Sequence, residues 1–334
     1  MERRLLSYIF LICLSWNVFA SGVEMSPNTR QMWLQNEVVQ QKTKEFYKYA
    51  DKDKVDTIIY EMETLTQPEQ EAIRFLLLQS MEQQKMPLTG KLAGYIESLL
   101  KTPPVYQMNH VGDGYEFTTP AFAYPAVANR LLNVWKQDQK ILQFVLAAER
   151  EELHLETWLN DGTEKERLAR EQLFIAELDG LSPPALNLIV EQVVDAENRL
   201  IFWLPSNPVM VRLAQVSEDP RVYKLLWRMR ATSESQKELF RLMDKEDPAS
   251  VDIIIDATNN PKLQIDAIQY LASYQPRSGV IKAFFIDKLS SKNQSEVDFV
   301  ANELVRQGYS DWLKTLLETN DEVNKAVIQK ALEE

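Results

Sequence analysis

Apolar residues recur at intervals of three or four along most of this 334-residue chain, and short polar breaks separate the stretches with this period. Such a period is typical of amphipathic helices. The first stretch runs from Arg30 to about Tyr49, and Asp51-Lys52-Asp53-Lys54 forms a polar break after it. Later stretches lie at 55–65, 66–86, 89–101, 126–135, 141–158, 164–178 and 186–205. The pattern therefore predicts a chain built mainly of helices.

Two of these stretches begin with capping residues. Thr66, with Glu69 three positions later, has the form of a capping box, in which each side chain accepts a hydrogen bond from the other residue's backbone N–H. Thr89 can cap the helix that runs to Lys101. We therefore expect helices to start at these threonines.

Residues 102–125 break the helical pattern, because they hold four prolines and two glycines. Weak alternation of apolar and polar residues at 105–110 and at 115–118 flanks Val111-Gly112-Asp113-Gly114, a sequence suited to a tight turn. The segment therefore predicts a β-hairpin inserted between helices.

After Pro205, helix start signals recur. They are Asp219-Pro220, Asp247-Pro248, Asn260-Pro261 and Asn320-Asp321. Asp and Asn accept hydrogen bonds from the free N–H groups at a helix start, and Pro suits the first turn. Apolar stripes at 281–289, 297–305 and 312–317 predict partner helices. Helices this short cannot bury such stripes alone, so we expect them to stack in pairs around a continuous core.

This C-terminal part resembles HEAT-type repeats, in which a D-P-x-V-like start precedes an A-x-x-x-L-like stripe. The best matches are Asp219-Pro220-Arg221-Val222 and the stretch from Asn260-Pro261 through Ala267 and Leu271. Pro220 and Pro261 are 41 positions apart, close to the ~40-residue period of such a helix pair. The resemblance implies a scaffold whose concave face binds a protein or a peptide. The alternative is an irregular helical bundle with ordinary caps.

The predicted fold class is all-α, an α-solenoid of HEAT-like helical repeats with one small inserted β-hairpin. The predicted regions are a signal peptide at 1–20, an N-terminal helical region at 21–101, a Pro/Gly-rich hairpin segment at 102–125, a central helical region at 126–204 and the repeats at 205–334. The chain has only 9 glycines, which favours helices joined by Pro-, Asn- and Asp-based turns over turn-rich β structure.

The N-terminus has the three parts of a secretory signal peptide. Arg3 and Arg4 form a basic start, an apolar run follows at 5–19, and Val18-Phe19-Ala20 is a small-residue cleavage pattern. A membrane anchor is the alternative, but this run of about 15 residues is shorter than the ~20 that span a bilayer. We expect cleavage after Ala20, export, a periplasmic location in a bacterium, and no stable membrane insertion of the mature chain.

Cysteine content and charge narrow the possible partners. Cys13, the only cysteine, lies within the apolar run, so the mature chain is expected to have no disulfide and no thiolate metal site. The net charge of −12 disfavours nucleic acid and anionic membrane surfaces. A basic partner fits this charge, as does the plainer role of keeping the protein soluble and monomeric.

The chain offers little catalytic or metal-binding chemistry. Glu151 and His154 form a single Glu-x-x-His unit, whereas a carboxylate di-iron site needs two. No Gly-x-Ser-x-Gly elbow, phosphate loop, dinucleotide fingerprint or zinc-protease motif occurs. Glu97-Ser98 is similar to a pair in wall-cleaving transglycosylases, but the Gly-Leu-Met-Gln stretch expected downstream is missing. We predict no catalytic residue, no metal and no cofactor.

Two places are candidate binding surfaces. The hairpin segment puts aromatic and polar groups on an irregular stretch, where function concentrates. These residues are Tyr106, His110, Asp113, Tyr115 and Phe117. The alternative is that the hairpin only packs over the N-terminal helices with its aromatics buried. The second place is Trp227 with Arg228 and Arg230, although a Trp on an apolar stripe usually belongs to the core.

Together these observations predict an exported helical-repeat scaffold that binds a protein or peptide partner, and no nucleic acid, in the bacterial envelope. The alternative is an enzyme that acts on polysaccharide or cell wall with acidic residues. Such an enzyme needs two carboxylates on either side of a cleft.

Overall fold

The computed structural model describes residues 22–112, 115–195, 203–245, 247–276 and 278–333. In this described part it contains 18 α-helices and a three-stranded sheet, and the structure is 72% helical. The prediction of an all-α fold with one small β insertion is therefore confirmed. None of the described helices is long and apolar enough to cross a membrane.

The chain forms two compact units, Met1–Lys140 and Ile141–Glu334. Each unit has a hydrophobic core of its own. The division falls inside helix α7 (Tyr124–Glu149), within the region that the sequence predicts to be central and helical.

Helix α7 is one helix where the sequence predicted two. The polar residues 136–140 between the two predicted stripes include no Pro or Gly, so nothing stops the helix there. The predicted continuation to Trp158 is wrong, because the backbone of Glu151 has a φ of 62°. A right-handed helix cannot pass through this left-handed conformation. A separate helix, α8 (Leu155–Asn160), follows.

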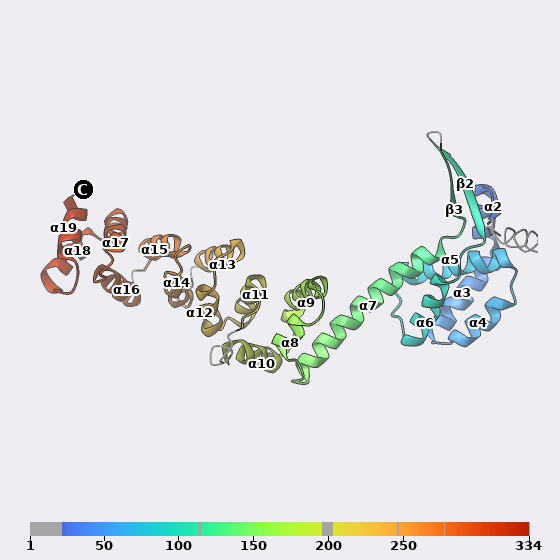
Figure 1. Cartoon of the computed structure of the whole chain (residues 1–334), viewed down its shortest axis with the longest axis horizontal. Helices are drawn as coiled ribbons and strands as arrows, with labels where there is room; N and C mark the ends of the chain where they lie inside the picture. The colour runs from blue at the N-terminus through green and yellow to red at the C-terminus, as the bar shows by residue number, and fades with distance from the viewer. Residues whose placement is uncertain (1–21, 113–114, 196–202, 246, 277, 334) are drawn as a thin grey trace, which may run out of the picture. The chain divides into compact units, whose positions relative to one another are not determined.

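The first unit packs short helices around one core (Figure 1). They are α2 (Pro27–Gln35), α3 (Glu37–Asp51), α4 (Val55–Glu63), α5 (Gln67–Gln83), α6 (Gly90–Leu100) and the first part of α7. Helix α3 packs on α4 and α5, and α2 packs on both α3 and α5. Their buried faces include Phe46, Ile58, Leu78 and Ile96.

The single helix predicted from Arg30 to Tyr49 is wrong, because α2 and α3 divide at Asn36. Asn36 has extended backbone, and its side-chain oxygen accepts from the backbone N–H of Val38 (2.9 Å) and Val39 (3.2 Å). The side chain thus caps a new helix start, which apolar periodicity alone does not reveal.

The two predicted threonine caps are confirmed. The Glu69 carboxylate accepts from the backbone N–H of Thr66 at 2.9 Å, as a capping box requires. The Thr89 hydroxyl accepts from the N–H of Leu92 at 3.1 Å.

The predicted hairpin is present as β2 (Tyr106–Gly112) and β3 (Tyr115–Pro120), which pair antiparallel. It projects away from the helices of the first unit in Figure 1. A third strand, β1 (Val23–Glu24), joins β2 in parallel, with Val23 beside Tyr106. Two residues are too few to show alternation, so the sequence pattern does not reveal β1.

A buried carboxylate anchors the base of the hairpin. Glu71 on α5 is fully buried. Its Oε1 accepts from the backbone N–H of Val105 at 2.6 Å and from Gln67 Nε2 at 3.3 Å, and its Oε2 accepts from the N–H of Tyr106 at 3.4 Å. A buried charge is tolerated when such hydrogen bonds satisfy it. The start of β2 is therefore tied to the middle of the helical core.

The second unit is a series of short helices. They are α8, α9 (Glu164–Glu177), α10 (Pro183–Val194), α11 (Asn207–Ser217), α12 (Pro220–Arg228), α13 (Ser233–Asp244), α14 (Ser250–Ala257), α15 (Gln264–Ser273), α16 (Gly279–Leu289), α17 (Gln294–Arg306), α18 (Ser310–Thr319) and α19 (Lys325–Glu333). The stretch predicted to be helical at 186–205 is described to Asp195 and again from Trp203, and residues 196–202 lie outside the described part.

These helices form two rows in Figure 1, with α11, α13, α15 and α17 in one row and α10, α12, α14 and α16 in the other. Along the first row α11 packs on α9 and α13, and α17 packs on α15 and α19. Along the second row α12 packs on α10 and α14. Between the rows, α14 packs on α15, α16 on α17 and α18 on α19. Each helix therefore packs mainly on its neighbours in the series.

Some of the predicted helix start signals of this unit cap the helix itself, and others cap a turn that precedes the helix. Asp219 caps α12, because its carboxylate accepts from the N–H of Arg221 at 2.8 Å. Asp247 and Asn260 instead cap turns that lead into α14 and α15 a few residues later. Asn320 likewise caps a turn, since its Oδ1 accepts from the N–H of Glu322 at 2.8 Å, and α19 begins later, at Lys325.

A buried polar network joins α11, α12 and α13. Glu238 is 1% exposed, and its carboxylate accepts from Tyr223 Oη (2.8 Å) and from Gln215 Nε2 (2.6 Å) and pairs with Arg241. Burial raises the pKa of Tyr223, and the adjacent Glu238 carboxylate adds to this shift. The network is fully hydrogen-bonded at Glu238, so it holds the three helices in one arrangement.

Replacing Asn36 by Ala is expected to lower the free energy of unfolding of the first unit by about 1 kcal/mol, because two N–H groups at the start of α3 lose their acceptor. Asn36→Asp keeps an acceptor at the same place and is the control. Urea unfolding followed by circular dichroism measures both. Equal stability of the Ala and Asp variants would show that the cap contributes nothing.

Asp219→Asn is expected to show a pH-dependent loss of stability. A hydrogen bond from Arg221 holds the pKa of Asp219 below its ordinary value. The charged form therefore stabilises the fold above the unfolded pKa of about 3.9, and this stabilisation is lost as the pH falls through the lower folded pKa. In urea unfolding at pH 7, we expect the variant to have a free energy of unfolding about 0.5–1 kcal/mol lower than that of the parent chain. Below pH ~4 the difference between the two proteins should become smaller. If the variant loses the same free energy of unfolding at pH 7 and below pH ~4, the charged form of Asp219 does not stabilise the fold.

Candidate functional site

The residues predicted to form a binding surface lie in both units. The structure brings His110 and Phe117 together on the hairpin of the first unit. It brings Trp227, Arg228 and Arg230 together around a groove in the second unit. Each group is therefore a surface by itself.

On the hairpin, His110 and Phe117 are directly opposite each other on β2 and β3. Their rings stack with centroids 5.1 Å apart, and His110 Nε2 lies 2.7 Å from Thr119 Oγ1. Phe117 remains 54% exposed. The histidine is thus engaged in local contacts, and only the phenylalanine offers a large free apolar surface.

At its base, the hairpin segment packs against the helices of the first unit with its aromatic residues buried or half-buried, as the alternative interpretation expects. Tyr106 is half-buried against the core of the first unit. Phe122 and Tyr124, which follow β3, are fully buried, and Tyr124 Oη donates to the Thr102 carbonyl at 2.9 Å. Asp113 lies outside the described residues, and of Tyr115 only the backbone is described.

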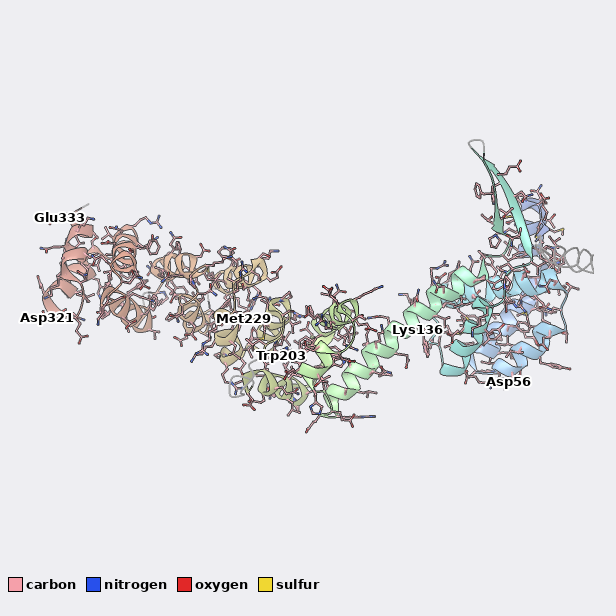
Figure 2. The ribbon with its side chains drawn as sticks, viewed as in Figure 1. Asp56, Lys136, Trp203, Met229, Asp321 and Glu333 are labelled. Carbon is pink, nitrogen blue, oxygen red and sulfur yellow. The ribbon has the colours of Figure 1, made fainter. Side chains whose placement is uncertain are left out.

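The groove in the second unit, called the Trp227 groove below, has a volume of about 630 Å³. It lies where α12 and α14 end, between the loop that follows α12 and the loop that follows α14. Its lining includes Lys224, Trp227, Arg228, Arg230, Asp256 and Lys262. Figure 2 labels Met229, which lines the same groove.

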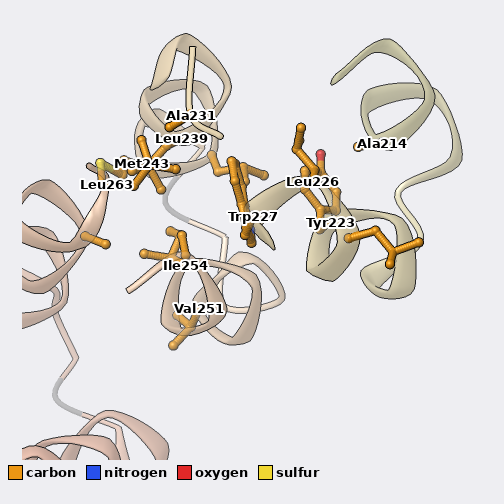
Figure 3. Close-up of a cluster of buried hydrophobic side chains, with 14 of the residues drawn as sticks. Ala214, Tyr223, Leu226, Trp227, Ala231, Leu239, Met243, Val251, Ile254 and Leu263 are labelled. Atoms are coloured by element: carbon orange, nitrogen blue, oxygen red, sulfur yellow. The ribbon is translucent and has the colours of Figure 1, made fainter. Parts of the chain in front are cut away.

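Trp227 lines the floor of the groove, and its side chain is also part of the hydrophobic core of the second unit. Only 3% of its surface is exposed, and its indole N–H donates to the Ile253 carbonyl at 3.0 Å. Figure 3 shows the ring within the cluster of buried side chains that includes Leu226 and Ile254. The ring is therefore held in one orientation by packing and by a hydrogen bond.

Asn260 fixes one wall of the groove to the other. It is buried, and its Nδ2 donates to the carbonyls of Trp227 (2.8 Å) and Met229 (2.9 Å). Its Oδ1 accepts from the N–H of Lys262 at 3.1 Å. The amide thus joins the end of α12 to the loop before α15, so the groove is formed before any ligand arrives. The sequence suggested only a helix start at this position.

The rim of the groove is positively charged. Lys224, Arg230 and Lys262 are exposed, and none of them forms an ion pair within the described part of the chain. Asp256 is the one carboxylate of the lining. The C-terminal ends of α12 and α14 add a partial charge of about −0.5 each. The groove therefore keeps a net charge of about +1 even without Arg228, which also lines it.

This arrangement suits binding better than catalysis. A fixed apolar floor and charged groups at the rim are typical of ligand sites. The single carboxylate has no acidic partner across the groove. A second, smaller groove of about 250 Å³ next to Trp203 (Figure 2) contains Glu164 and Glu171, but both carboxylates come from α9.

No protein-family model, curated protein or solved structure matches this chain. The resemblance to HEAT-type repeats therefore stays a prediction, and the site has to be interpreted from its own geometry.

Asn260→Ala is expected to lower the free energy of unfolding of the second unit by about 2 kcal/mol, because the buried Trp227 carbonyl and the part-buried Met229 carbonyl lose their donor. Asn259→Ala is the matched control, since Asn259 is exposed and bonds only the Asp256 carbonyl of its own turn. We expect the control to change stability by less than about 0.5 kcal/mol in urea unfolding. Equal effects of the two variants would refute the role given to Asn260.

Proposed function

We propose that this protein is an exported helical-repeat scaffold of the bacterial envelope, whose second unit binds a segment of a protein partner in the Trp227 groove. The observation that carries the proposal is a groove formed by the loops of successive stacked helices, with a fixed floor and an unneutralised rim. Scaffolds of this kind use surfaces created by stacking to bind partners.

The packing of the second unit supports the α-solenoid part of the proposal. Its helices pack along two rows, and each helix contacts mainly its neighbours in the series. This is the organisation expected of repeats that bury their apolar faces on each other. The cap at Asp219, the best sequence match to a repeat start, opens α12, the helix that carries Trp227.

The sequence supports the envelope part of the proposal. Residues 1–20, which lie outside the described part, have the composition of a signal peptide. The chain that follows has no cysteine, so its stability rests on packing and hydrogen bonds rather than on disulfides.

The observations favour binding over the alternative of an acidic polysaccharide-cleaving enzyme. That reaction needs two carboxylates on opposite sides of the substrate. The Trp227 groove has only Asp256, and in the smaller groove Glu164 and Glu171 project from the same helix. Neither lining offers carboxylates from two facing elements.

Photo-crosslinking in intact cells tests the proposal. A photoreactive amino acid at position 262 stands on the rim of the groove, and one at position 292 stands on an exposed loop between α16 and α17. We expect one defined protein partner to crosslink at 262 and not at 292, and the product to be recovered from the periplasmic fraction. Both variants should keep the circular dichroism of the parent chain.

Two outcomes contradict the proposal. One is the absence of a protein crosslink at 262 in a correctly folded variant. The other is the same set of products at 262 and 292, because a groove-bound partner cannot react equally with both positions.

A further inference from the structure

We infer that the Trp227 groove takes an acidic, extended peptide segment, with carboxylates on the cationic rim and an apolar side chain over the floor. This inference rests on the proposed function and names the chemistry of the partner. Charge complementarity and the character of the floor carry it.

The rim cations are grouped around one groove and are unpaired, whereas several other cations of the same unit form ion pairs. Arg221 pairs with Asp219 and Glu191, and Lys288 pairs with Glu296. By contrast, Lys224, Arg230 and Lys262 lack any ion pair among the described residues. From 220 to 233 the sequence has four basic residues and no acidic one. Lysines elsewhere in the unit, such as Lys282 and Lys292, also lack an ion pair among the described residues, but at this groove three unpaired cations line one surface together.

The unit as a whole has the opposite charge. Residues 141–334 contain 33 acidic and 22 basic side chains. At physiological ionic strength, exposed charges act over about 8 Å. A ligand inside the groove therefore interacts mainly with the rim cations, whereas a long polyanion that extends beyond it meets the acidic surface. This difference favours a short acidic peptide segment over nucleic acid or an anionic polysaccharide.

The floor adds the second requirement. Beneath and beside the cations, Trp227, Met229, Ala231 and Pro261 line the groove with apolar surface. Because Asn260 holds the two walls together, a ligand does not have to order them on binding, and preformed sites lose less affinity to ordering. An apolar side chain between two acidic residues matches this floor and rim.

Fluorescence anisotropy of labelled decapeptides with the mature chain tests the inference. The probe alternates Glu and Leu. One comparison peptide has Lys in place of Glu, and another has Ser in place of Leu. The test variant is the Arg230→Glu, Lys262→Glu double substitution. The matched control is Lys282→Glu, Lys292→Glu, which makes the same charge change elsewhere in the unit, at lysines without an ion pair among the described residues.

We expect the Glu/Leu peptide to bind the parent chain and the control alike, and to bind the test variant at least tenfold more weakly. The Lys/Leu peptide should not bind, and the Glu/Ser peptide should bind several-fold more weakly. Raising the salt concentration should weaken binding of the Glu/Leu peptide to the parent chain. Circular dichroism confirms that both double variants are folded.

Equal binding of the Glu/Leu peptide to the test and control variants overturns the inference. So does an oligothymidylate or an acidic polysaccharide that competes as well as the peptide, because the groove then selects polyanions in general. If a partner crosslinks at position 262 but no acidic peptide binds, the inference fails and the proposed function stands. If the peptide binds but no partner crosslinks in cells, the proposed function fails instead.

Discussion

The apolar faces of short helices have to be covered by other helices, and most of this structure follows from that constraint. Helices of about ten residues, such as α12 and α15, gain little stability by themselves in water. In the second unit each one is buried by its neighbours in the series, so the core continues from helix to helix. The first unit meets the same constraint by closing its helices around a single core.

Stacking also creates the groove. When α12 and α14 pack side by side, their C-terminal ends and the loops that follow them meet at one edge. Asn260, in the loop after α14, donates to the carbonyls of Trp227 and Met229 at the end of α12. The buried Trp227 side chain fills the space under the groove. The same contacts therefore hold two successive helix pairs together and shape the binding surface, which links the stability of the unit to its proposed role.

Charge is distributed unevenly over the second unit, and the acidic peptide proposed for the groove is argued from this asymmetry. Several arginines and lysines elsewhere in the unit pair with carboxylates, as Arg241 does with the buried Glu238. At the groove, Lys224, Arg230 and Lys262 form no ion pair among the described residues, and Asp256 is the one carboxylate of the lining. A protein with a net charge of −12 thus presents a local positive site, a feature hidden by its overall composition.

The sequence by itself determined the features that depend on neighbouring residues: the helical period, the caps at Thr66, Thr89 and Asp219, and the two strands of the hairpin. These signals act within about four residues, so they can be detected along the chain. Tertiary structure alone decided the pairing of β1 with β2, the burial of Trp227, and the meeting of Lys224 with Lys262. The reason is physical, since stacking brings together residues nearly forty positions apart, and no local pattern records which of them will meet.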